Sequence, residues 1–212
     1  FMRRNIRPII IFLGLFLTSG LSQANSQSIE HLGYQALENR DYKKALKYIS
    51  FLATNGDARA QYNMGVFYRD GIEVKLDRVQ ALRWFLKAAD GGNMLAQYAV
   101  GLAFYRGDGS FPDAQMALNY FLEAALRGHA AAPMHIGRQF YLGKGVKQNH
   151  ARAYFWWSLA SDRNAAGANK HLQRLTTIMK DEEKREAREL KAKCQSMTLR
   201  QCLKFLVPLE NL

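Results

Sequence analysis

Five histidines and two cysteines are the residues of this 212-residue chain that could bind a metal or act in nucleophilic catalysis. Neither type has the spacing of a zinc site, and the sequence contains no His-Glu-x-x-His string, nucleophile elbow or serine-lysine motif. We therefore expect no catalytic constellation, no metal site and no cofactor. The histidines are expected to be ordinary surface or half-buried residues: His31, His129, His135, His150 and His171.

A glycine-lysine pair could indicate a phosphate-binding loop, but its spacing excludes one. Five residues rather than four separate Gly137 from Gly143, and Gly145 follows Lys144 where such a loop requires Ser or Thr. These glycines belong instead to a pattern that recurs along the chain. They therefore indicate how helices are positioned rather than where a phosphate binds.

The sequence repeats itself every 36 residues. The positions in register are Gly65, Gly101 and Gly137; Gly71, Gly107 and Gly143; Ala81, Ala117 and Ala153; and Trp84, Tyr120 and Trp156. A period between about 20 and 50 residues indicates a stack of similar units, none of which can bury its apolar face alone. The sequence therefore predicts an all-α solenoid of helix hairpins.

Each unit is expected to contain two helices. Apolar and small residues at three- and four-residue steps over 58–69 predict the first helix, which ends at Gly71 in a left-handed conformation. The second helices are predicted to begin at the N-caps Asp41, Asp77, Asp113 and Asn149 and to end at Gly56, Gly92, Gly128 and Asn164. A glycine inside a helix costs about 1 kcal/mol relative to alanine, so Gly65, Gly101 and Gly137 predict close helix approach.

The second unit resembles the Sel-one-like repeat (SLR), a relative of the tetratricopeptide repeat. The matching residues are Ala60-Gln-Tyr-Asn-Met64-Gly65-Val-Phe-Tyr68, Gly71, Asp77, Ala81, Trp84-Phe85, Lys87-Ala88-Ala89 and Gly92, whereas Glu73 replaces a glycine of the pattern. The resemblance implies a right-handed α/α solenoid of the exported bacterial type over 25–168. Its units are a degenerate one over 29–56, full ones over 58–92 and 94–128, and a last one over 130–164, followed by capping helices over 169–212.

The N-terminal residues have the three parts of a secretory signal. Three arginines within 1–7 precede an apolar run over 9–17, and a small-x-Ala pattern ends at Ala24. The run is shorter than the roughly 20 residues that span a bilayer, so we expect a signal peptide over 1–24, cleaved after Ala24, rather than a retained anchor. Loss of the three arginines lowers the formal net charge from +12 to +9. This charge favours acidic partners or an anionic envelope surface, or it only keeps the protein soluble.

The tail is expected to form one or two capping helices with an apolar stripe made of Leu172, Leu175, Ile178 and Met179. A capping box from Thr198 to Gln201 predicts a further helix that starts near Leu199. The turn before it would let Cys194 bond to Cys202, which one continuous helix would hold about 12 Å apart. An oxidising compartment favours this disulfide over two free thiols, and the resemblance to cysteine-rich members of the family does so too.

Tetratricopeptide-like stacks use their first helices to line a concave face. By this resemblance, the partner-binding residues are Tyr62, Val66, Arg69, Tyr98, Leu102, Tyr105, Met134, Arg138 and Tyr141. Aromatic and arginine residues dominate binding hot spots. Tyrosine and methionine at helical spacing are equally typical of a core, so groove and core are both open hypotheses for these positions.

The leading hypothesis is an exported, non-enzymatic scaffold or adaptor that mediates protein-protein interaction in the bacterial envelope through its concave surface. It would be a monomer whose partner is another protein or peptide segment, with acidic segments among the candidates. One alternative is a cell-wall-acting enzyme or an inhibitor of such an enzyme. Another is a binder of acidic polysaccharide through the basic surface, which predicts steep salt dependence; we expect no nucleic-acid partner for an exported protein.

Overall fold

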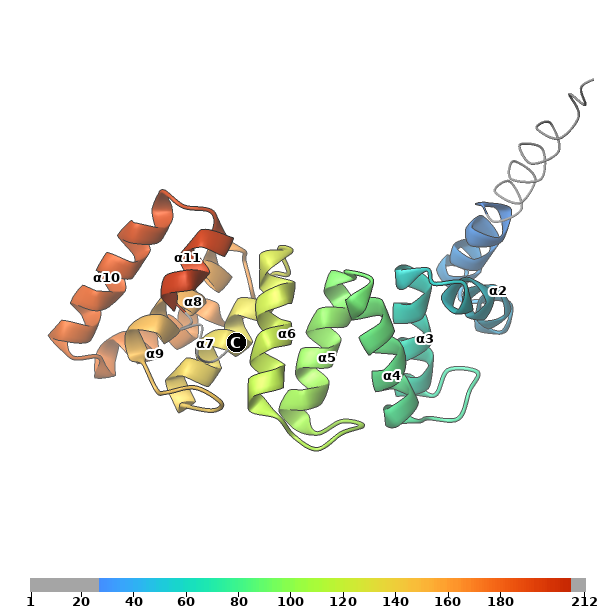
Figure 1. Ribbon diagram of the computed structural model, residues 1–212, viewed down its shortest axis with the longest axis horizontal. Coiled ribbons are helices and arrows are strands. Elements are labelled where there is room, and N and C mark those ends of the chain that lie inside the picture. Colours follow the sequence, from blue (N-terminus) through green and yellow to red (C-terminus); the bar gives the residue numbers. More distant parts are fainter. Residues whose placement is uncertain (1–26, 207–212) are drawn as a thin grey trace, which may run out of the picture.

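The computed structural model describes residues 27–206, so the predicted signal peptide lies outside the described residues. A helix over 27–38 is followed by α2 (Tyr42–Thr54), α3 (Ala58–Asp70), α4 (Arg78–Asp90), α5 (Met94–Arg106), α6 (Ala114–Leu126), α7 (Ala132–Leu142), α8 (His150–Asp162), α9 (Ala168–Ile178), α10 (Asp181–Gln195) and α11 (Leu199–Leu206). They form an elongated array with α2 near one end and α9 and α10 at the other (Figure 1). Within 27–206, no helix combines the length and the apolar character needed to cross a membrane.

The predicted all-α solenoid is confirmed. Helices α3 and α4, α5 and α6, and α7 and α8 form consecutive hairpins, and each hairpin packs against the next one along the chain. The apolar interior is correspondingly divided into three clusters: one from the first hairpin to α3, one around α4 and α5, and one from α6 to the cap. Each unit is therefore stabilised by its neighbours, as expected for a repeat array.

Local residue types determine where the helices begin and end. The side chains of Asp41, Asp77, Asp113 and Asn149 each accept the backbone N–H three residues ahead, which confirms the four predicted N-caps. The predicted left-handed residues also have positive φ: 69° at Gly71, 83° at Gly107 and 67° at Gly143. Asn164 has a φ of 57°, so it does replace glycine after the last repeat.

The glycines inside the first helices allow the two helices of each hairpin to touch. A Cβ atom on Gly101 would lie 2.6 Å from Cδ1 of Phe121, and one on Gly137 would lie 2.5 Å from Cδ1 of Trp157. A Cβ atom on Gly65 would overlap the ring of Phe85 in the same way. The predicted close approach is therefore confirmed in three successive hairpins.

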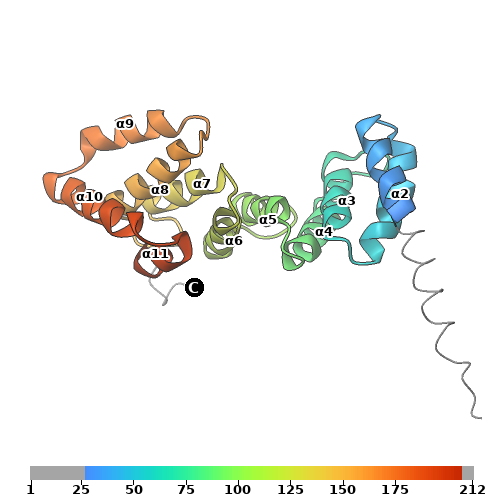
Figure 2. The same ribbon diagram turned by 90° about the horizontal axis from the view of Figure 1, so that it is seen from above.

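The cap consists of α9, α10 and α11. Helices α9 and α10 both pack against α8, which closes the end of the array (Figure 2). The capping box is present, since Thr198 N donates to Gln201 Oε1 (2.9 Å) and Gln201 N donates to Thr198 Oγ1 (3.3 Å), and α11 begins at Leu199 as predicted. Cys194 and Cys202 are joined in a disulfide with their Cα atoms 5.2 Å apart.

The predicted apolar stripe is wrong at one residue, Ile178. Leu175 and Met179 are buried, but Ile178 is 53% exposed. The reason is that α9 ends at Ile178 and the chain becomes extended at Met179, with a φ of −66° and a ψ of 134°. The helical spacing therefore no longer determines which side chains face the core.

Candidate binding surface

Two pockets lie along the row of first helices α3, α5 and α7. The first, here named the inner pocket, has a volume of 480 Å³ and lies between α3, α4 and α5. The second, the cap pocket, has a volume of 590 Å³ and lies between α7, α8 and the start of α9. Seven of the nine predicted partner-binding residues line these pockets: Tyr62, Arg69, Tyr98 and Leu102 the first, and Met134, Arg138 and Tyr141 the second.

The other two predicted residues lie outside both linings. Val66 is half-buried against the cluster around α4 and α5. The ring of Tyr105 is half-buried too, and it lies 4.3 Å from Nζ of Lys144 and 5.7 Å from Cζ of Arg138. These side chains therefore pack against the core while part of each reaches the surface, so the groove and core hypotheses are compatible. Their role in binding stays a prediction.

Histidines that were not among the predicted partner-binding residues lie at this surface. His129 lines the inner pocket, and its ring stacks on that of Tyr98 with centroids 4.0 Å apart. His135 lines the cap pocket, its Nε2 lies 3.0 Å from Oη of Tyr98, and its ring stacks on Phe121. The expectation of half-buried histidines is met, but their position between the pockets depends on how α6 packs against both α5 and α7.

Burial keeps these histidines neutral near neutral pH. Burial, together with the nearby Arg106 and Arg138, lowers the pKa of His135 to about 4. Burial also lowers the pKa values of His129 and His171, and it raises that of Tyr98. The charge of the face at neutral pH therefore comes from arginine and lysine side chains rather than from imidazolium.

The arginines of the inner pocket are mostly neutralised. Arg69 forms a bidentate pair with Asp70, with both N–O distances at 2.7 Å. Arg78 Nη1 lies 3.3 Å from Oδ1 of Asp108, whose loop belongs to the next repeat. Arg106 makes no ion pair with any of residues 27–206, so it is the one unpaired arginine in this lining.

The cap pocket has an aromatic floor and an unpaired arginine. Trp157 Nε1 donates to the carbonyl oxygen of Met134 (3.0 Å), and the Trp157 ring lies 5.5 Å from that of Tyr141 and 4.8 Å from that of His171. Arg138 has no carboxylate partner within the described chain, and the lining contains neither Asp nor Glu. The cap pocket is therefore apolar with a positive charge at its edge.

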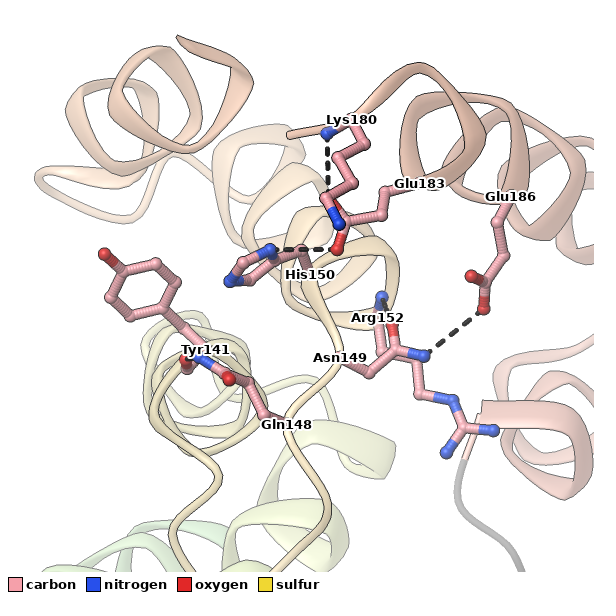
Figure 3. Close-up of polar contacts among 8 residues, drawn as sticks. All are labelled: Tyr141, Gln148, Asn149, His150, Arg152, Lys180, Glu183 and Glu186. Atoms are coloured by element: carbon pink, nitrogen blue, oxygen red, sulfur yellow. Dashed lines mark hydrogen bonds and ion pairs between the residues drawn. The ribbon is translucent and has the colours of Figure 1, made fainter. Parts of the chain in front are cut away.

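A polar network fixes the cap against the last repeat (Figure 3). His150 Nδ1 lies 3.0 Å from Oε1 of Glu183, and Asn149 Nδ2 donates to Oε1 of Glu186 (3.3 Å), so the start of α8 is joined to α10. Gln148 Nε2 also donates to the carbonyl oxygen of Tyr141 (2.7 Å). The end of α7 that carries Tyr141 is therefore held by the same junction.

The face has the features of a binding surface. Within 27–206, no three His, Cys, Asp or Glu side chains are grouped so as to hold a metal ion. The face instead presents half-buried aromatic rings with arginines at their edges, on a rigid stack of hairpins. Extended surfaces of this kind are typical of repeat scaffolds.

The comparison with protein families identifies the type of repeat. The Sel1 repeat model matches residues 28–57, 58–93, 95–129 and 136–164. These matches cover more than half of the chain, so the protein belongs to the Sel1 repeat family. Sel1-repeat proteins generally mediate protein-protein interaction, and their fold is typically a non-catalytic scaffold.

Two solved structures are similar to this chain. One is a protective antigen of uropathogenic Escherichia coli strains with an SLR fold. It is 28% identical with a TM-score of 0.67, and the aligned region covers 71% of this chain and 33% of the antigen chain. The other is a Sel1 repeat protein from Oxalobacter formigenes. It is 26% identical with a TM-score of 0.62, and the aligned region covers 66% of this chain and 58% of the Oxalobacter formigenes chain. The chain thus spans about a third of the length of the first protein and somewhat over half of the length of the second. Among curated proteins, none matches the chain.

Proposed function

We propose that this protein is an exported scaffold or adaptor that binds another protein in the bacterial envelope through the face of α3, α5 and α7. The observation that carries the proposal is the pair of pockets on that one face, lined by aromatic, leucine and arginine side chains. Tyrosine and arginine are enriched among the residues that contribute most to binding. The general role of Sel1 repeats in protein-protein interaction supports the same function.

Three observations support export. The N-terminal sequence has the three parts of a signal peptide. A disulfide between Cys194 and Cys202 is stable in an oxidising compartment. A similar protein is a protective antigen of uropathogenic strains. Cell fractionation should recover the protein from the periplasm or the medium, with Asn25 as its first residue by N-terminal sequencing; a cytoplasmic protein that retains residues 1–24 would contradict export.

Site-specific photocrosslinking tests the binding face. Leu95 in the inner pocket and Leu142 in the cap pocket are 44% and 50% exposed, so a photoreactive phenylalanine can replace either with little strain. Val79 and Met116 are exposed as well but line neither pocket, and they serve as matched controls. We expect a specific protein adduct in envelope extract from the pocket positions and none from the controls.

Two outcomes would contradict this function. Adducts formed equally at all four positions would show that the face has no special role. An acidic polysaccharide ligand would be favoured instead if heparin fully blocked adduct formation and if the protein bound immobilised heparin at 50 mM salt but not at 200 mM salt. That alternative is favoured by the unpaired cations Arg106 and Arg138.

A further inference from the structure

The cap pocket has the size and lining of a site for a large apolar side chain. Its volume of 590 Å³ lies within the roughly 300–1,000 Å³ of typical ligand pockets. Met134, Tyr141 and Trp157 form its apolar lining, and Leu142 at its edge is half exposed despite being apolar. Because Trp157 is 2% exposed and hydrogen-bonded to the backbone, the floor is rigid before a partner binds.

The charges around this pocket are of one sign. Arg138 lines it, and Arg138 and Lys144 both contact the ring of Tyr105. Lys170 and Arg174 of α9 act electrostatically on His171 from the opposite wall. The lining contains neither Asp nor Glu, and Glu183 and Glu186 at the junction of α8 and α10 contact His150 and Asn149. The edge of the pocket therefore complements a negatively charged ligand.

We propose that the cap pocket binds an acidic segment of a partner protein. The segment inserts one aromatic or large aliphatic side chain against Met134, Tyr141 and Leu142, above the buried Trp157, while flanking carboxylates pair with Arg138 and Lys144. The inference rests on the proposed protein-binding function and specifies the chemistry of the partner. Charge complementarity supplies register and encounter rate, and the apolar anchor supplies most of the affinity.

Fluorescence anisotropy of labelled peptides tests this proposal with the mature chain. The probe is a peptide with one phenylalanine flanked on each side by two glutamates. Two control peptides have alanine for the phenylalanine or lysines for the glutamates. We expect the probe to bind and each control peptide to bind at least about tenfold more weakly, because each lacks one of the two recognition elements.

Matched variants locate the site. Arg138→Gln combined with Lys144→Gln should weaken probe binding about tenfold, since both residues are exposed and only their charge is lost. Arg127→Gln should leave it within about twofold, because Glu123 already neutralises that guanidinium and Arg127 lines neither pocket. Circular dichroism of each variant should match the parent, which excludes unfolding as the cause.

Several results would overturn the proposal. Equal binding of the alanine and phenylalanine peptides, or complete displacement by heparin, would show a purely electrostatic surface. Equal effects of the Arg127 variant and the Arg138 and Lys144 variant would place the site elsewhere. Absence of probe binding together with a specific protein adduct at Leu142 would refute the acidic chemistry but leave the proposed function standing. Adducts confined to Val79 and Met116 would refute the function itself.

Discussion

The inner pocket and the cap pocket share a backbone frame but differ in charge. Both lie on first helices that approach their partners over a glycine, Gly101 in one case and Gly137 in the other. The inner pocket pairs two of its arginines with aspartates, whereas Arg138 of the cap pocket has no such partner within 27–206. The repeat therefore determines where a pocket forms, and residues outside the repeat pattern determine what it can bind.

The difference in charge can be traced to one position of the 36-residue repeat. Arg138 occupies the position that Val66 and Leu102 hold in the two preceding units. A position that is apolar in two repeats thus carries a charge in the last one. The end of the array adds a second difference, since α9 rather than another complete repeat forms the wall of the cap pocket.

Gly101→Leu should have the largest effect, because it breaks the frame that both pockets share. The new side chain would collide with the ring of Phe121, and overpacking of this kind costs about 3 kcal/mol in the free energy of unfolding. Gly137→Leu should cost a similar amount through Trp157. Urea unfolding of both variants measures this. Arg106→Leu, at an exposed position on the same helix as Gly101, is the control. An unchanged free energy of unfolding in Gly101→Leu would refute the close approach.

His135 lies between the two pockets and should make stability depend on pH. Its pKa is about 4 in the folded protein against 6.5 ordinarily. Between these values only the unfolded state binds the proton, so the free energy of unfolding should fall as pH drops from 6.5 to 4, by up to about 3 kcal/mol. Above pH 6.5 and below pH 4 this group should contribute no further change.

Urea unfolding at pH 7, 5.5 and 4.5 measures this dependence. His135→Gln keeps a polar side chain near Tyr98 Oη but does not titrate in this range. The variant should therefore lose less stability than the parent over the same interval. Identical pH profiles of parent and variant would show that the buried imidazole is not responsible.

The Cys194–Cys202 disulfide should stabilise the cap while leaving both pockets unchanged. Its sulfurs connect α10 to α11, and neither cysteine lines the inner or the cap pocket. Replacing both cysteines by serine should cost about 2 kcal/mol, as expected for a short closed loop. Hydrogen exchange should become faster in α11 but not in α7. Unchanged exchange in α11 would show that packing alone holds that helix.

Removing two carboxylates should make the inner pocket resemble the cap pocket. Asp70→Asn with Asp108→Asn leaves Arg69 and Arg78 without ion-pair partners. In a background of Arg138→Gln and Lys144→Gln, this change should strengthen binding of the acidic phenylalanine peptide about threefold, by anisotropy. Stability should change by less than about 1 kcal/mol, because exposed ion pairs contribute little. Unaltered binding would show that paired charges are not what distinguishes the pockets.

The fold could be predicted almost entirely from the sequence because each backbone feature depends on a local residue type. An aspartate or asparagine caps each second helix, and a glycine, or Asn164 in the last unit, ends it. The pocket charges could not be predicted in this way. Arg78 pairs with Asp108 thirty residues away, and Tyr98 meets His135 only because α6 packs against both α5 and α7. Ile178 was misplaced because helical spacing does not indicate where a helix ends.

Nuclear magnetic resonance of the ¹⁵N-labelled mature chain, titrated with the acidic phenylalanine peptide, tests the central claim most directly. The account predicts saturable shifts at Met134, Leu142 and the indole N–H of Trp157, with Tyr62 and Leu95 of the inner pocket unaffected. Shifts centred on the inner pocket, or spread over exposed residues outside both pockets, would contradict it.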